Sequence, residues 1–221
     1  GLGQNDRTWR SSPVQIPGTT WATGRKSKGV NQDNSMISLK TDGTLWAWGR
    51  SSNGNTTWQG NTFKSSPTQI PGTTWRSVEF GSHVLATKTD GTLWSWGYNE
   101  HGLNDRTEYS SPKQIPGTDW GSEIMQASIC SAAIKTDGTL WSWGYGGPGV
   151  FGTNVGGAPY KRSSPVQCPG STWSQITGLT GSNVLALKTD GTLWGIGAGE
   201  QGQLAQQLKI NYSSPIQIGT D

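Results

Sequence analysis

Histidines, cysteines and acidic residues are the side chains of this sequence that could do chemistry. The only two histidines, His83 and His101, have no serine and aspartate at the spacing of a nucleophilic catalytic set. No Cys-x-x-Cys or His-Glu-x-x-His string offers zinc ligands. No glycine-rich phosphate-binding motif leads from a strand into a helix. The sequence therefore predicts no enzyme activity, no metal and no cofactor.

The two cysteines occupy different positions of an internal repeat. Cys168 stands where the other copies have isoleucine, and Cys130 stands where they have Ser35, His83 and Asn183. Because free cysteine is among the most buried residue types, we interpret both as buried structural thiols. A disulfide between them is the alternative, and it leaves the redox compartment open.

Four equivalent aspartates, each two residues after a lysine, offer one sharper hypothesis. Asp42, Asp90, Asp137 and Asp190 would lie at the same end of their repeats and form a mixed-charge ring with the lysines. Such a ring could bind a cation or a partner. The favoured interpretation is that aspartate is simply the residue that a tight hairpin turn prefers.

These aspartates belong to a ten-residue string that occurs four times, as KTDGTLWAWG, twice as KTDGTLWSWG, and as KTDGTLWGIG. The copies span Lys40–Gly49, Lys88–Gly97, Lys135–Gly144 and Lys188–Gly197. Asp-Gly predicts a two-residue type I′ turn, which would pair Leu39 with Trp46 and Ile37 with Trp48. The predicted structural residues of the four hairpins are Asp42, Gly43, Trp46, Trp48, Asp90, Gly91, Trp94, Trp96, Asp137, Gly138, Trp141, Trp143, Asp190, Gly191 and Trp194.

Tryptophan is abundant, with thirteen copies in 221 residues, seven of them in these hairpins. A buried Trp hides about 150–250 Å², which is worth roughly 4–6 kcal/mol gross at about 25 cal/mol per Å². A lone hairpin cannot bury so much surface. The hairpins must therefore stack on one another.

A proline-bearing segment, Ser-Ser-Pro-x-Gln, occurs five times and predicts a short strand on the outer edge of each unit. Apolar residues before each hairpin indicate a further strand, except in the longer 22–35 stretch, which we interpret as a solvated loop. Four short strands per unit, repeated radially, predict an all-β fold, a β-propeller. The predicted units are 1–21 (partial), 22–75, 76–120, 121–173 and 174–221, and both ends are expected to be cut within a repeat.

The segments between each hairpin and the next proline segment vary in length, and insertions of this kind gather on one face of a repeat protein. They span 50–64, 98–109, 145–162 and 198–212. Their aromatic and histidine side chains are the candidate binding residues, with packing over the blade edges as the alternative. The candidates are Trp58, Phe63, Tyr98, His101, Tyr145, Phe151, Tyr160 and Tyr212.

Composition narrows the classes of partner. The net charge is +3 with 14% charged residues, which disfavours nucleic acid as a partner because such binders carry a clustered basic face. No apolar stretch is long enough to insert into a membrane. A protein or a cell-surface glycan is the expected partner.

The hairpin ending Asp-Gly-x-Leu-Trp-x-Trp-Gly, the glycine-containing loop and the proline-bearing outer strand, at about 50 residues per unit, resemble the regulator of chromosome condensation repeat. The resemblance covers essentially the whole chain and implies a seven-bladed propeller, of which about four to four and a half blades are present. The rest of the propeller is expected from the missing part of the same chain or from another chain. The Gly-Gln-Leu string of the family is best kept at Gly202–Leu204. The near-identity of the copies resembles bacterial and bacteriophage members.

Three functions follow from the repeats and the resemblance. The first is a non-enzymatic binding or structural module of a virion appendage or a bacterial surface or secreted protein, located on a virion or outside the cell. The second is a guanine-nucleotide exchange factor for a small GTPase, as in the best-known family members. The third is a secreted enzyme inhibitor that uses one face of the propeller.

Overall fold

Four antiparallel sheets of four strands form the regular part of the computed structural model, within the residues that it describes. Those residues are 2–6, 8–24, 27–30, 34–51, 54, 63–98, 102–127, 130–145, 161–179, 183–207 and 209–219. They contain no helix, and hence no helix that is long and apolar enough to cross a membrane.

Each sheet is one blade, and its strands follow chain order. Blade one contains β1 (Lys28–Val30), β2 (Ser35–Leu39), β3 (Leu45–Arg50) and β4 (Phe63–Ile70). Blade two contains β5 (Trp75–Phe80), β6 (His83–Lys88), β7 (Leu93–Gly97) and β8 (Tyr109–Ile115). Blade three contains β9 (Trp120–Ala127), β10 (Cys130–Lys135), β11 (Leu140–Tyr145) and β12 (Lys161–Gln167). Blade four contains β13 (Trp173–Leu179), β14 (Asn183–Lys188), β15 (Leu193–Gly197) and β16 (Tyr212–Ile218).

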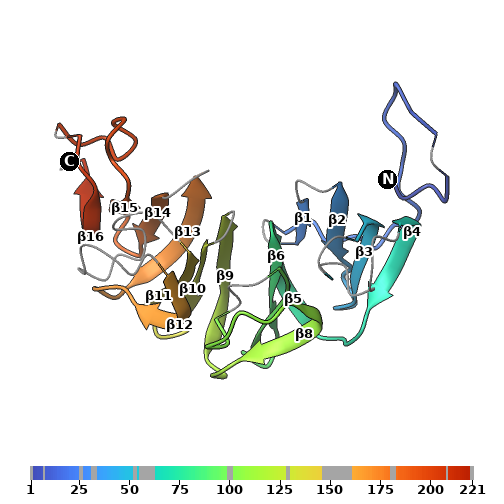
Figure 1. Cartoon of the computed structure of the whole chain (residues 1–221), viewed down its shortest axis with the longest axis horizontal. Coiled ribbons are helices and arrows are strands. Elements are labelled where there is room, and N and C mark those ends of the chain that lie inside the picture. Colours follow the sequence, from blue (N-terminus) through green and yellow to red (C-terminus); the bar gives the residue numbers. More distant parts are fainter. Residues whose placement is uncertain are drawn as a thin grey trace.

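The blades follow one another along an open arc, with the two chain ends at its tips (Figure 1). The first strands lie on the inner side, where β1 packs beside β5, β5 beside β9, and β9 beside β13. The fourth strands form the outer edges. This radial arrangement of four-stranded sheets is that of a β-propeller.

The proline-bearing segments are outer strands in four of their five copies, namely in β4, β8, β12 and β16. The fifth copy, at Ser11–Ile16, forms no strand, because no described hairpin lies beside it to form a ladder. The 22–35 stretch differs from the predicted loop, since it contains β1. Lys28, in that strand, is nevertheless exposed.

The predicted hairpin register is wrong by one residue in all four copies. Trp46 lies opposite Ser38 and Trp48 opposite Met36, and the other hairpins show the same shift. The reason is a three-residue loop, closed by bonds from the Lys40 amide to the Thr44 carbonyl and from the Gly43 amide to the Lys40 carbonyl. Only the glycine has positive φ, at 78° in Gly43, so a type I turn followed by a left-handed glycine replaces the type I′ turn.

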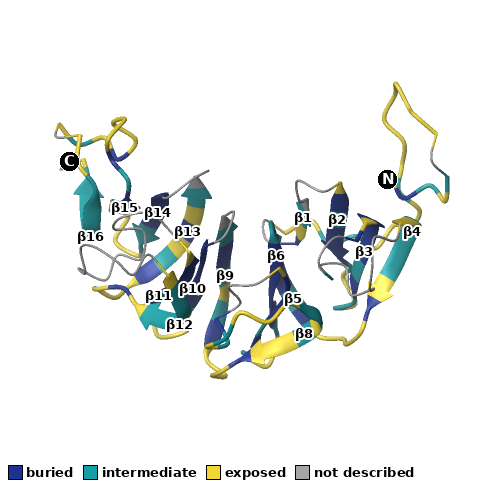
Figure 2. Ribbon diagram, viewed as in Figure 1, coloured by how far each residue is buried: buried dark blue, intermediate teal, exposed yellow. Residues whose placement is uncertain are grey.

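The register gives every blade two different apolar faces. One, the tryptophan face, carries both tryptophans of a hairpin (in blade four, Trp194 and Ile196). It also carries the Trp that begins the first strand in blades two to four, and Trp21 in blade one. The other, the aliphatic face, carries residues such as Ile37, Leu39 and Leu45 of blade one. The aliphatic face of each blade packs against the tryptophan face of the next, in three clusters. Figure 2 shows the burial concentrated in the middle strands, with more exposed outer strands.

Backbone hydrogen bonds repeat at every junction between blades. The carbonyls of Gly43, Gly91 and Gly138 accept from the amides of Trp75, Trp120 and Trp173, each at 3.0 Å. The glycine of each hairpin turn therefore also joins its blade to the next one.

Candidate binding surface

The strands run between two rims of the arc. The turn rim contains the hairpin turns around Asp42, Asp90, Asp137 and Asp190. The loop rim is where the third strand ends and the fourth begins, as at the Arg50–Phe63 and Tyr145–Lys161 pairs. The variable segments all leave from the loop rim.

On the turn rim, an aspartate, a threonine and a tryptophan form the same hydrogen-bonded relay in every blade. In blade two the Thr92 amide and hydroxyl donate to Asp90 Oδ1 at 3.0 and 2.6 Å, and Trp94 Nε1 donates to the Thr92 hydroxyl at 2.8 Å. The other three blades repeat these bonds. The threonine hydroxyl, followed by its amide, lowers the pKa of each aspartate below the usual value.

The lysine of each repeat lies between two tryptophans. Lys88 Nζ is 4.8 Å from the ring centroid of Trp75 and 4.4 Å from that of Trp94. The other three lysines are held in the same way, within 5.1 Å of two rings. The lysines and aspartates thus hold tryptophans in place, which accounts for them without a ligand. Among the described residues no three His, Cys, Asp or Glu side chains gather as a metal site would require.

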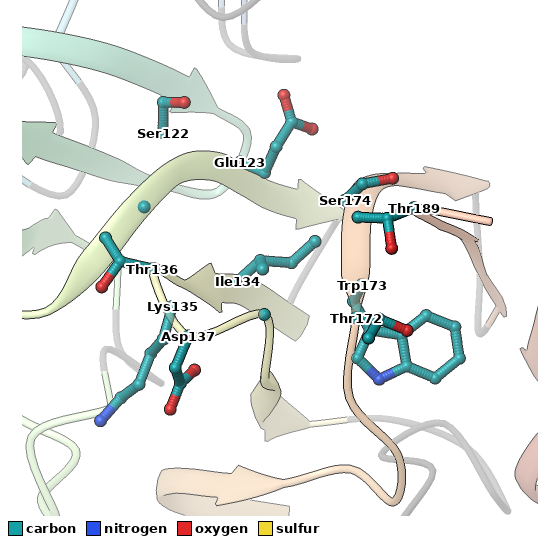
Figure 3. Close-up of a pocket in the computed structure, with 12 residues that line it drawn as sticks. Ser122, Glu123, Ile134, Lys135, Thr136, Asp137, Thr172, Trp173, Ser174 and Thr189 are labelled. Atoms are coloured by element: carbon teal, nitrogen blue, oxygen red, sulfur yellow. The ribbon is translucent and has the colours of Figure 1, made fainter. Parts of the chain in front are cut away.

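A hollow of about 420 Å³ opens on the turn rim between blades three and four. Figure 3 shows Ser122 and Glu123 on one side of β9 and Lys135 and Asp137 on the other. Blade three has one more residue here than its neighbours, because Gly121–Glu123 separates Trp120 from Ile124 where two residues stand in blades two and four. Glu123 Oε2 accepts a bond of 3.4 Å from the Ile176 amide of the next blade.

This hollow is better explained as a junction than as a binding site. Trp173, which lines it, is only 2% exposed and offers no ring to a ligand. Lys135 pairs with Asp119 at 3.1 Å in addition to its two rings.

The predicted binding residues of the loop rim fall into two groups. Phe63, Tyr98 and Tyr145 are 55%, 36% and 39% exposed, and Tyr212 is half-buried. They belong to four different blades, and three of them lie at strand ends rather than within loops. Lys161 Nζ stacks over Tyr145 at 4.8 Å. The other candidates, Trp58, His101, Phe151 and Tyr160, lie outside the described residues.

The structure brings one predicted residue, Phe63, together with apolar side chains that the sequence did not single out. Leu2 is 41% and Trp9 98% exposed, and both line a hollow of about 550 Å³ with Phe63. Arg10, Arg50, Lys64 and Asp6 complete the charged part of its lining, and Arg10 bonds to Asp6 at 2.6 Å. We call this cluster the N-terminal groove.

A repeated four-residue string holds the wall of the groove in place. Asn-Asp-Arg-Thr occurs at 5–8 and again at 104–107. The Asn5 amide donates to the Ser65 carbonyl at 2.8 Å, and the Asn104 amide donates to the Ser163 carbonyl at 2.7 Å. Both asparagines have positive φ, a conformation that asparagine tolerates better than most residues. Trp9 directly follows the first copy of this string, so the recurrence could have placed it on the loop rim.

His83 and the cysteines belong to the packing between blades. His83 is fully buried, and its Nε2 lies 2.8 Å from the Ser131 hydroxyl of the next blade. Cys130 and Cys168 are buried thiols, as predicted, and burial raises the pKa of each to about 11. Thiols with so high a pKa are poor nucleophiles.

No family model matches the sequence, and no curated protein matches it. Solved structures do match. Human WBSCR16 has 21% identity and a TM-score of 0.71, over 85% of this chain and 51% of that one. Yeast RCC1 (Prp20), solved with Kap60 bound, has 18% identity and a TM-score of 0.71, over 88% and 48%. Prp20p from Saccharomyces cerevisiae, described with its binding to Gsp1p and histones, has 18% identity and a TM-score of 0.70, over 85% and 49%.

These similarities establish the fold. The chain is an all-β protein with the fold of RCC1-like β-propellers, as its repeats predict. It spans about half the length of the propellers that it matches.

Proposed function

We propose that this chain is part of a β-propeller that binds a partner protein through its loop rim and does no bond-making chemistry itself. The N-terminal groove carries this proposal, because three exposed apolar side chains, Leu2, Trp9 and Phe63, surround one hollow. Tryptophan and arginine are the residues most enriched in binding hot spots. An exposed apolar cluster on a soluble domain is typical of an interaction site.

The groove predicts the charge of its partner. Arg10, Arg50 and Lys64 outnumber Asp6 in its lining, and Asp6 is itself paired with Arg10. An acidic protein surface with an apolar side chain at its centre would complement it.

Among the finer functions, guanine-nucleotide exchange on a small GTPase has the better support. Prp20p, which shares the fold, is described by its binding to Gsp1p and histones, and the repeat resemblance implies an exchange factor. The identity of 18% supports the fold alone, so the partner and the exchange activity are both proposals.

Two measurements test this function. Purified Gsp1p is titrated against the whole chain, and release of a fluorescent guanine nucleotide from a small GTPase is then followed with and without the chain. We expect saturable binding and faster release. Binding without faster release would keep the protein-binding proposal and reject exchange. The absence of both binding and faster release would reject Gsp1p as a partner.

Substitutions in the groove then test the surface. We expect Trp9→Ala and Phe63→Ala each to weaken partner binding by about tenfold or more, since truncating a hot-spot aromatic costs about 2 kcal/mol. Both side chains are more than half exposed, so the fold should survive. Ile210→Ala is the control, because Ile210 is 48% exposed at the other end of the arc. Equal affinity in all three variants would reject the groove.

A role in a virion appendage or bacterial surface protein is the second candidate, and the near-identical Lys-Thr-Asp-Gly-Thr-Leu-Trp strings favour it. This role predicts that the chain binds a bacterial surface protein or glycan. A secreted inhibitor, in contrast, would form a tight complex with an enzyme. Binding of the chain to intact bacterial cells, lost in Trp9→Ala and kept in Ile210→Ala, would support it over exchange.

A further inference from the structure

Blades two and three each pack between two described blades, so the exposure of their side chains is not set by a missing neighbour. Within the described residues of these two blades, Tyr98 and Tyr145 are the only large apolar side chains that are exposed, at 36% and 39%. Each directly follows the Trp-Gly pair that ends its hairpin. The two rings therefore occupy the same place on the loop rim of neighbouring blades.

The two rings are separate platforms and not parts of one apolar patch. Gly97 precedes Tyr98, while Gly144 precedes Tyr145 and Lys161 lies opposite it in the ladder. A protein–protein interface has an apolar core at its centre. Isolated rings in a polar surface instead fit a ligand that presents rings of its own, with apolar faces and polar edges. A sugar ring has this character, because its CH groups lie on its faces and its hydroxyl groups at its edge.

The separation of the two platforms requires a polymer. Packed sheets lie about 10 Å apart, so rings at equivalent places in neighbouring blades are separated by about that distance or more. One sugar ring does not span this length, whereas a chain of several linked sugars does.

The ladder beside Tyr145 supplies positive charge. Lys161 holds its Nζ 4.8 Å from the centroid of the Tyr145 ring. Arg162, the next residue, lies opposite Gly144, and its Nε is buried without a hydrogen-bond partner. Because a buried donor without a partner costs free energy, an anionic group that reaches this guanidinium would bind favourably.

A loop of blade two lies beside these two cations. The Asn104 amide donates to the Ser163 carbonyl of β12 at 2.7 Å, which brings the exposed Arg106 and Glu108 to this part of the rim. Asp105, in the same loop, accepts a bond of 2.7 Å from a tyrosine hydroxyl. The charge here is positive, since three cations stand against these two acids.

We infer that the loop rim of blades two and three binds a carboxylate-bearing polysaccharide. Its sugar rings stack on Tyr98 and Tyr145, and one of its carboxylates pairs with Arg162. This site goes beyond the proposed function, because it does not include the N-terminal groove.

Two other anionic polymers fit the site less well. An acidic polypeptide supplies carboxylates without a ring for each tyrosine. A single strand of nucleic acid stacks on aromatic rings, but it requires a clustered basic face, which a net charge of +3 does not provide.

Isothermal titration calorimetry of the whole chain with alginate and with polygalacturonate, two polymers of uronic acids, tests the inference. We expect saturable binding that weakens as salt is added. Dextran (a neutral polysaccharide), poly-L-glutamate and oligo-dT are the comparison ligands. Binding of neither uronic acid polymer would overturn the inference, and so would equal or tighter binding of any comparison ligand.

Variants then identify the contact. Tyr98→Ala and Tyr145→Ala should each weaken alginate binding about tenfold, because each removes one stacked ring. Tyr98→Phe and Tyr145→Phe are the matched controls, since they keep the ring and should keep the affinity. Arg162→Gln should weaken binding and reduce its dependence on salt. Circular dichroism checks that each variant is folded, and unchanged affinity in the folded alanine variants would reject the stacking.

Trp9→Ala separates this site from the proposed function. Trp9 lines the N-terminal groove, so the substitution should weaken Gsp1p binding and leave alginate binding unchanged. A chain that binds alginate but not Gsp1p would reject the proposed protein partner alone. Alginate binding that is lost in Trp9→Ala would place the polymer in the groove and overturn the site on blades two and three.

Discussion

The face between blades two and three and the open face of blade four are built from the same repeat positions and differ in what covers them. Leu93 of blade two packs against the tryptophan face of blade three and is fully buried. Leu193 of blade four has the same place in its hairpin and is 37% exposed. The comparison separates what a residue contributes to its own hairpin from what it contributes to the next blade.

The contrast leads us to expect that the junctions contribute much of the stability of this fold, because Leu93 is fully buried only where the next blade covers it. A repeat unit contacts only its neighbours, so the stability of the array is close to a sum of unit and junction terms. Pairs of identical substitutions at an internal position and at the equivalent position of blade four can therefore isolate the junction term.

Replacing the first leucine of the third strand should give the largest difference in stability between an internal blade and blade four. Leu93→Ala should lower the free energy of unfolding by about 2–5 kcal/mol, because it leaves a cavity in a packed junction. Leu193→Ala should cost less than about 1 kcal/mol, since its side chain is partly in water. Urea unfolding of both variants measures the two costs. Equal costs would show that the junction contributes little.

The turn glycines test the same junction through the backbone. Gly91 and Gly191 have φ of 80° and 86°, so an alanine at either position pays the same left-handed strain of about 1 kcal/mol. Gly91→Ala also collides with the Thr118 backbone of blade three, which should add about 1–3 kcal/mol.

Urea unfolding again compares the two, and Gly191→Ala serves as the control for the strain. If both variants lost the same stability, the predicted collision at Gly91 would be relieved without cost.

Replacing the threonine of the relay should give a smaller difference in stability between the two blades. Thr92→Val removes the acceptor of Trp94 Nε1 and a donor to Asp90, at a cost of about 1–3 kcal/mol where the groups are buried. Thr92 is buried and Thr192 is half-buried, so Thr192→Val should cost less, because water can replace the lost partners. Near-ultraviolet circular dichroism would report whether the Trp rings change their packing.

The repeats predict the fold well because each unit carries the same local signals. The Asp-Gly turns, the alternating strands and the proline of the outer strand all indicate the same four-stranded unit, and the structure contains it. The turn type is less determined, since Asp-Gly fits both a two-residue and a three-residue loop. Burial could not resolve the register either, because both faces of each hairpin are apolar.

The binding surface was only partly predictable. Phe63 could be found as an aromatic residue in a variable segment. Leu2 and Trp9, which line the same hollow, lie 61 and 54 residues earlier in the chain. The bond from the Asn5 amide to the Ser65 carbonyl holds their segment beside β4. The recurring Asn-Asp-Arg-Thr string before Trp9 could place that residue on the loop rim, but it does not identify Phe63 as a neighbour.

The smallest expected effect is the pH dependence of the relay. The Thr92 hydroxyl and amide lower the pKa of Asp90 in the folded state, while an unfolded aspartate titrates near 3.9. Its contribution to stability is therefore fully present above about pH 4 and is lost as the pH falls through the lower, folded pKa.

Asp90→Asn keeps the oxygen that accepts both bonds and removes the titration. The free energy of unfolding should therefore fall more in the wild type than in this variant when the pH is lowered from about 5 to about 2. These two values lie about one pH unit above and two below the unfolded pKa. Asp190→Asn should show the same pH dependence, since its relay contains the same hydrogen bonds. The difference between the two sites is that no described blade follows Asp190. A larger loss at Asp90 than at Asp190 would show that the junction, and not the turn alone, depends on the charge.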